Sequence, residues 1–162
     1  MKLYLLRHAS AEDTARSDAA RELTKEGKEE ARLAGAALAK LGAKPDHIFT
    51  SPLVRARQTA EQAGKALKFD GYVEVLAELE NGHSADQLLK ALKPYSDAKE
   101  LLLVGHMPDL AGHLAALIGA EDAGNLALGK GSVACVELEQ LRAAAGQLKW
   151  LMRQKQLAEI AG

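Results

Sequence analysis

Short uninterrupted apolar runs mark the strands around which this chain is organised. Residues 3–6 and 101–104 form two such runs, and residues 47–50 form a shorter one. A continuous apolar run of this length is typical of a parallel strand that is buried on both faces. Between the runs, apolar residues recur at helical spacing. This alternation predicts an α/β fold around a mostly parallel sheet.

Capping residues indicate where several helices begin and end. Thr24 can cap a helix whose apolar positions stop just before Gly42. Ser84 opens a capping-box pattern for a second, shorter helix. The Met-Pro pair at residues 107–108 is expected to open a third helix, which Gly119 would end.

Ser51 and Pro52 are interpreted as the N-cap and first residue of a further helix. Arg55 then falls in about the first turn, where a cation opposes the helix dipole. This placement makes sense if an anion binds at that end of the helix. The alternative is an ordinary exposed arginine, which is how Arg57 is interpreted.

The remaining segments complete the sheet and one long loop. Residues 72–76 predict a short strand, and residues 132–138 and 147–152 predict an antiparallel pair at one edge of the sheet. Trp150 alternates with apolar neighbours in the last of these, so it is interpreted as a core residue. Residues 9–22 form a polar loop, and most of its charged side chains are expected to be solvated.

Two histidines and two arginines stand at or just beyond the ends of the predicted strands. The first run stops at Arg7-His8, another stops before His106, and Arg55 follows the third. Ligands of open α/β sheets gather outside the carboxyl ends of the strands. Guanidinium groups bind anionic oxygens, and a neutral imidazole can act as a nucleophile. The set therefore predicts a site for an anionic substrate.

Composition and charge narrow the class of protein. The 162 residues fit a single domain spanning residues 1–162, and a net charge of −1 provides no basic field for nucleic acid or a membrane surface. No apolar stretch approaches the roughly 20 residues of a membrane span. The only cysteine, Cys135, is interpreted as a small buried hydrophobic residue. Because the chain enters a strand at once, no signal peptide is expected and the protein is predicted to be cytoplasmic.

Four motifs resemble those of the histidine phosphatase superfamily, and they occur in that family's order. They are Leu-Arg-His-Ala at residues 6–9, Leu-Thr-Lys-Glu-Gly at 23–27, Ser-Pro-Leu-Val-Arg-Ala-Arg-Gln-Thr-Ala at 51–60 and Val-Gly-His-Met-Pro at 104–108. The small size and the Pro-Leu-x-Arg-Ala context look most like the compact bacterial phosphohistidine phosphatases of the SixA type. The motifs together are far more specific than the Arg-His dipeptide alone.

The resemblance implies a three-layer α/β/α sandwich and a set of residue roles. His8 would be the nucleophile, Arg7 and Arg55 the phosphate ligands, and His106 the second histidine of the site. No metal ion or other cofactor is expected, and neither histidine has a metal-ligand spacing around it. One departure is Ala9, where the superfamily usually has glycine, so the local turn is expected to differ slightly.

The general acid is left open between two loop carboxylates. Many superfamily members place an acid after the third strand, where Glu78 is the nearest match and Glu80 the alternative. An equally supported interpretation is that Glu78 is a solvated loop carboxylate with no role in catalysis. Arg21 and Ser51 are further candidates for lining the site.

The expected reaction is hydrolysis of phosphohistidine on a protein partner, a phosphohistidine-containing signalling domain. Short connections leave little room for a cap over the site, so a side chain of another protein could enter it. The alternatives are a small-molecule phosphomonoesterase or mutase, and a phosphoprotein-binding module without turnover.

Overall fold

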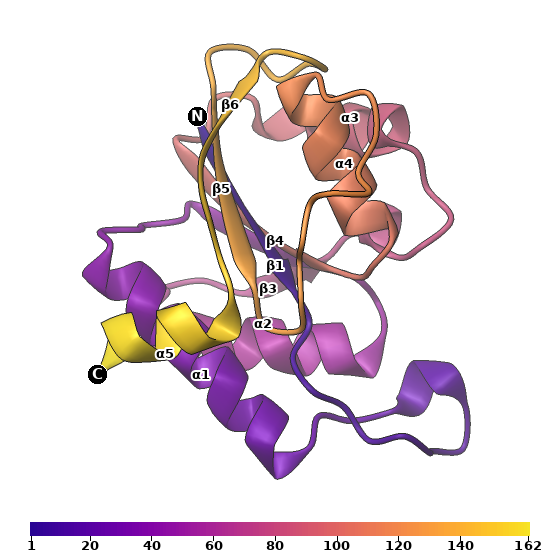
Figure 1. The fold of residues 1–162 in the computed structure, drawn as a ribbon, viewed down its shortest axis with the longest axis vertical. Coiled ribbons are helices and arrows are strands. Elements are labelled where there is room, and N and C mark those ends of the chain that lie inside the picture. Colours follow the sequence, from indigo (N-terminus) through magenta and orange to yellow (C-terminus); the bar gives the residue numbers. More distant parts are fainter.

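A six-stranded sheet runs through the middle of the protein (Figure 1). The computed structural model describes residues 1–162. The strands are β1 (Lys2–Arg7), β2 (His47–Thr50), β3 (Val73–Val75), β4 (Glu100–Gly105), β5 (Val133–Leu138) and β6 (Gly146–Met152). Their order across the sheet is β3-β2-β4-β1-β5-β6. Strands β1 to β4 pair in parallel, whereas β5 is antiparallel to both β1 and β6.

The predicted strands are confirmed, and so is the antiparallel pair at one edge. The third strand is shorter than predicted, because Tyr72 and Leu76 lie outside it. In the register of the central strands, Arg7 lies opposite Gly105 and Thr50 lies opposite Val104. The carboxyl ends of β1, β4 and β2 are therefore aligned at one edge of the sheet.

Five α-helices cover the two faces of the sheet. They are α1 (Lys25–Lys40), α2 (Val54–Ala66), α3 (Ala85–Leu92), α4 (Asp109–Ile118) and α5 (Gln154–Ala161). Helices α1, α2 and α5 pack on one face, and α3 and α4 on the other, which gives the expected three-layer α/β/α sandwich (Figure 1). The Thr24 side chain accepts from the Gly27 N–H, and Gly119 ends α4 with a left-handed conformation at φ 74°, as the sequence predicted.

The prediction for the start of α2 is wrong. The helix begins at Val54 with Leu53 at the N-cap, so Ser51 and Pro52 both precede it. The Ser51 hydroxyl accepts from the Leu53 N–H at 3.2 Å and bonds to His106 in another element at 2.7 Å. This hydrogen bond to a distant residue holds Ser51 outside the helix. Capping preferences depend only on neighbouring residues, so they give no information about such a bond.

Two features escaped the sequence analysis. The segment predicted as the loop of Glu78 forms a 3₁₀ turn, Ala77–Leu79. The chain also ends in the unpredicted helix α5, which packs against α1. Leu157 of α5 is fully buried and Ile160 is partly buried beside it. Their i, i+3 spacing was the available signal, but a helix of this length gives a weak periodicity.

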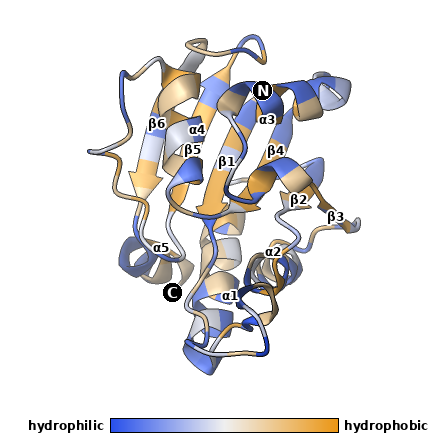
Figure 2. Ribbon diagram, turned by 90° about the vertical axis from the view of Figure 1, so that its right-hand side faces the viewer, coloured by the Kyte–Doolittle hydropathy of each residue, from blue (hydrophilic) through white to orange (hydrophobic).

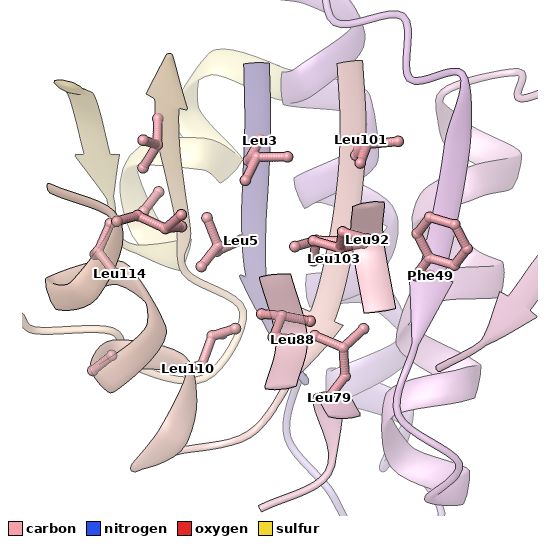
Figure 3. Close-up of a cluster of buried hydrophobic side chains, with 14 of the residues drawn as sticks. Leu3, Leu5, Phe49, Leu79, Leu88, Leu92, Leu101, Leu103, Leu110 and Leu114 are labelled. Atoms are coloured by element: carbon pink, nitrogen blue, oxygen red, sulfur yellow. The ribbon is translucent and has the colours of Figure 1, made fainter. Parts of the chain in front are cut away.

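The central strands are buried on both faces, which explains their continuous apolar runs. Leu3 and Leu5 point into the cluster beneath α3 and α4 (Figure 3). Tyr4 and Leu6 belong to the cluster beneath α1, α2 and α5 on the other face. Hydrophobic residues accordingly follow the strands through the middle of the molecule (Figure 2). None of the helices is both long enough and apolar enough to cross a membrane.

Helices α1 and α2 approach each other closely where Gly35 faces Ala63. A Cβ atom at residue 35 would overlap the Ala63 carbonyl oxygen and lie 2.7 Å from the Ala63 Cα. Because these are backbone atoms, the helices would have to move apart.

We expect Gly35→Ala to lower the free energy of unfolding by about 1–3 kcal/mol, although alanine favours helix. Gly112→Ala in α4 is the matched control, since no atom lies within 4 Å of its Cβ position. That change should raise the free energy by up to about 1 kcal/mol. Urea unfolding of both variants measures the difference, and stabilisation by both would contradict the close approach of α1 and α2.

Candidate active site

The aligned strand ends place three polar residues side by side. His8, Ser51 and His106 each follow directly on the last residue of β1, β2 and β4. Backbone bonding continues past the strands, because the His8 N–H donates to the Gly105 carbonyl at 3.1 Å and the Ser51 N–H donates to the Val104 carbonyl at 3.0 Å. The sheet itself therefore fixes the positions from which these side chains extend.

His8 presents a neutral imidazole with one free nitrogen. Its ring centroid lies 5.1 Å from that of His106. Its Nδ1 lies 2.8 Å from the Ala9 carbonyl oxygen, which can only accept, so Nδ1 carries the proton. Burial lowers the pKa of His8 to about 3, and the nearby cations Arg55 and Arg7 act in the same direction. The Nε2 atom of His8 is therefore left with a lone pair at neutral pH.

His106 is oriented by the hydroxyl of Ser51. Its Nε2 lies 2.7 Å from Ser51 Oγ, and its Nδ1 is buried without a hydrogen-bond partner. Burial lowers the pKa of His106 to about 4, and the charge of Arg55 lowers it further. Ser51 thus supports the second histidine rather than a helix end.

The two arginines each bring a buried Nε–H without a partner to the site. Arg7 donates through Nη1 to the Leu128 carbonyl at 2.9 Å, and Arg55 donates through Nη1 to the Asp18 carbonyl at 3.0 Å. The Nε atoms of both side chains are buried without partners. An unpaired buried N–H is costly, so a group that accepts from it would bind favourably. With His106 Nδ1, these atoms suit a ligand carrying several anionic oxygens.

Thr59 links the backbone of the His8 turn to helix α2. The Ala9 N–H donates to Thr59 Oγ1 at 3.1 Å, and that hydroxyl donates to the Arg55 carbonyl at 2.7 Å. Ala9 is fully buried and is not among the residues with positive φ. Its methyl group is therefore accommodated without backbone strain in the position where the superfamily usually has glycine.

The remaining candidates lie around this centre. The Arg21 Nε lies 3.1 Å from the Asp18 carboxylate, next to Arg55. Glu78 is half-buried in a turn whose Leu79 carbonyl packs against Gly105 at the end of β4. Glu78 makes no hydrogen bond or ion pair, so its role as an acid stays a prediction.

Asp18 and Thr59 are the contributors that sequence reasoning missed. Asp18 lies in the loop whose charged side chains are mostly expected to be solvated, and Thr59 stands in the sequence only as part of the motif at residues 51–60. Spacing gives no signal for Asp18, because its pairing with Arg55 joins segments 37 residues apart.

The other histidines and the cysteine lie outside this centre. His47 pairs with Glu74 at 3.3 Å at the opposite end of β2, and His113 is buried within α4. Cys135 is buried, as expected, and burial raises the pKa of its thiol to about 11. No group of three or more His, Cys, Asp or Glu side chains is arranged to hold a metal ion.

Comparisons with known proteins agree with this geometry. The family described as histidine phosphatase superfamily (branch 1) matches residues 3–93. The chain is 31% identical over 118 residues to the phosphohistidine phosphatase SixA of Escherichia coli (strain K12), covering 72% of this chain and 73% of that protein. It is 34% identical over 131 residues to the SixA homolog of Haemophilus influenzae, covering 74% and 78%.

Solved structures extend the likeness to nearly the whole chain. The structure of the protein histidine phosphatase SixA complexed with tungstate gives a TM-score of 0.88 at 27% identity, covering 97% of this chain and 99% of that one. The structure described as a putative phosphohistidine phosphatase SixA from Agrobacterium tumefaciens gives a TM-score of 0.75 at 25% identity, covering 93% and 97%.

The buried histidines make the folded protein sensitive to acid. The pKa values of His8 and His106, about 3 and about 4, lie below the ordinary value of 6.5. At a pH between the folded-state pKa values and 6.5, the unfolded chain binds more protons than the folded chain. The free energy of unfolding therefore keeps its full value above about pH 6.5. It decreases as the pH falls from there toward the pKa values of the two histidines in the folded protein.

We expect the urea midpoint to be lower at about pH 5 than at about pH 7, because only the unfolded chain can protonate these side chains there. His8→Asn should remove part of the difference, since that variant lacks one of the buried imidazoles. An identical pH dependence in His8→Asn and the native chain would show that His8 is not buried as a neutral ring.

Proposed function

The chain belongs to the histidine phosphatase superfamily, and we propose that it is a metal-independent phosphohistidine phosphatase that works through a phospho-His8 intermediate. The observation that carries the proposal is the state of His8. Its Nδ1 is bonded to a carbonyl, its imidazole is neutral, and the Nε atoms of Arg7 and Arg55 and the Nδ1 of His106 are buried in the protein without partners. A nucleophile and an anion-binding set are thus combined.

Arg7 and Arg55 would hold the non-bridging oxygens of the phosphoryl group. Phosphoryl transfer depends on positioning and on neutralising charge on those oxygens. Two guanidinium groups, which stay protonated, supply both without requiring a metal ion. The tungstate bound in the related structure is a tetrahedral oxyanion like phosphate, which supports an oxyanion site of this kind.

The covalent step would use the lone pair on His8 Nε2. That nitrogen forms a bond to phosphorus while the bond from phosphorus to the substrate imidazole breaks, and the leaving imidazole keeps the electron pair. Water then attacks phospho-His8, releasing inorganic phosphate and restoring the neutral ring. No oxidant, reductant or second substrate is needed for this cycle.

His106 would stabilise the transition state as a hydrogen-bond donor. Its pKa of about 4 leaves it neutral in the free protein. A phosphoryl dianion placed beside it would raise that pKa, because an opposite charge favours the protonated ring. Its unpartnered Nδ1 is then the donor available to the phosphoryl oxygens.

A protein-borne substrate suits the shape of the site. Only three residues separate β2 from α2, and only three separate β4 from α4, so these connections form no cap over the strand ends. A small-molecule phosphomonoesterase or mutase would instead enclose most of its ligand. We therefore propose a phosphohistidine-containing signalling domain as the partner. We also propose that the protein acts in the cytoplasm, a reducing compartment in which a single cysteine stays unpaired. A binding module without turnover would have no need of the free Nε2 on His8.

Trapping the phosphoenzyme tests the proposal directly. With a phosphohistidine-bearing protein as substrate, we expect mass spectrometry to place the phosphate on His8. His8→Ala should abolish turnover and labelling without unfolding the protein, because it removes the nucleophile from a fold held by other contacts. Phosphate on His106 together with normal turnover in His8→Ala would reverse the assignment.

The role of Glu78 depends on the leaving group. A positioned general acid contributes about 10²–10⁴-fold when the leaving group needs its proton. A leaving imidazole needs less help than an alkoxide, since it can already carry a proton. We expect Glu78→Gln to lower kcat/KM for a phosphate ester more than for phosphohistidine.

Glu80→Gln is the neighbouring control for this comparison, because Glu80 lies just beyond the same turn. Equal losses on both substrates would mean that Glu78 acts in binding or structure. No loss on either substrate would make Glu78 a solvated loop residue and would leave the roles of His8 and the arginines unaffected.

A further inference from the structure

The loop between β1 and α1 extends from the body of the molecule as an arm, residues 9–22 (Figure 1, lower right). Its base is closed by a β-bridge between Ala11 and Leu23 and by a hydrogen bond from the Glu12 N–H to the Glu22 carbonyl at 2.8 Å. The short 3₁₀ turn on this arm, which begins at Asp18, packs against α2. The arm therefore reaches the helix that carries Arg55.

Asp18 accepts every side-chain hydrogen bond that Arg55 makes. Arg55 Nη1 donates to the Asp18 carbonyl at 3.0 Å, and Nη2 donates to its Oδ2 at 3.3 Å. These contacts occupy the edge of the guanidinium that carries Nη1. The other edge keeps the unpartnered Nε–H and the second Nη2 hydrogen, a pair of parallel donors that matches two phosphoryl oxygens.

Arg21 fixes Asp18 from the other side. Its Nε lies 3.1 Å from Asp18 Oδ1, and its Nη1 donates to the Glu12 carbonyl at 3.2 Å. A continuous series of polar contacts thus runs from the base of the arm through Arg21 and Asp18 to Arg55. Each carboxylate oxygen of Asp18 has an arginine partner, which restricts its orientation.

This series of contacts is poorly suited to stabilising the fold. The Asp18 side chain is 70% exposed, and exposed ion pairs contribute little to folding. Arg55 nevertheless holds the pKa of the Asp18 carboxyl below its ordinary value. Asp18 is therefore ionised at neutral pH and serves as a fixed acceptor, not as a proton donor.

Building on the proposed function, we propose that Asp18 is a positioning residue that holds the guanidinium of Arg55 with its free edge toward the phosphoryl group. An arginine side chain has several rotatable bonds, and Arg55 has no other side-chain acceptor in this structure. Without the Asp18 carboxylate, Arg55 would keep only the single bond from Nη1 to the main-chain carbonyl of residue 18, about which the guanidinium can turn. A displacement of about 1 Å in a catalytic group can cost as much as about 100-fold in rate.

Asp18 also acts on the charge balance around His106. Its negative charge raises the pKa of His106, whereas Arg55, Arg7 and Arg21 lower it. Replacing the carboxylate by an amide would therefore lower that pKa. If the reaction needs protonated His106, kcat decreases on the alkaline side of its pH profile as His106 loses its proton. In the amide variant this alkaline limb would move to lower pH. A role confined to folding would not shift it.

The test compares Asp18→Asn with Asp13→Asn, an exposed carboxylate on the same arm that makes no hydrogen bond or ion pair. Calorimetry with inorganic phosphate measures the anion site without turnover, and kcat and KM are measured on a phosphohistidine-bearing protein. We expect Asp18→Asn to lower kcat/KM by about 10- to 100-fold, to weaken phosphate binding and to shift the alkaline limb. Asp18→Glu should restore part of the activity, and Asp13→Asn should match the native chain.

Two results would overturn the role of Asp18. One is equal phosphate affinity and equal kcat/KM in Asp18→Asn and Asp13→Asn. The other is a loss of affinity that follows a large fall in melting temperature, since that would indicate a structural role. If the native chain binds phosphate but does not hydrolyse phosphohistidine, the proposed function fails. Weakened phosphate binding in Asp18→Asn would then still support the positioning of Arg55.

Discussion

The parallel alignment of β1 with β4 and of β4 with β2 is the constraint on which the site depends. It places Arg7 opposite Gly105 and Thr50 opposite Val104, so the residues that follow these strands emerge at one edge. Backbone hydrogen bonds extend this register to His8 and Ser51. A slip of one residue would exchange the two faces of a strand and move Arg7 and His8 to the opposite sides of the sheet.

Burial then determines the chemistry of the side chains that this register brings together. Water exclusion keeps His8 and His106 neutral, with pKa values of about 3 and about 4. The same burial leaves the Nε–H groups of Arg7 and Arg55 and the Nδ1 of His106 without partners. The unpartnered donors reduce the stability of the free protein at any pH, and the neutral histidines reduce it only at acid pH. Both effects favour an arriving phosphoryl group, which accepts hydrogen bonds and supplies negative charge.

The layers of the sandwich contribute unequally to the site. Helix α2 carries Arg55 and Thr59, and Thr59 holds the turn after His8. The α3 and α4 side contributes through the packing of Leu79 against Gly105 at the end of β4. The arm between β1 and α1 lies outside both layers and reaches the site through Asp18. Its sequence is therefore less constrained by the core than that of the strands.

The sequence alone determined the strands and most helices, because burial on both faces gives unbroken apolar runs. It also placed Arg7, His8 and His106 at strand ends, and their roles in catalysis stay predictions. The runs at residues 3–6 and 101–104 located His8 and His106 without reference to any distant contact. The place of Ser51 depended on its bond to His106, 55 residues away, which overrides its local preference for a helix cap. The pairing of Asp18 with Arg55 was likewise decided only by tertiary structure, since contacts between distant segments leave no periodic trace in a sequence.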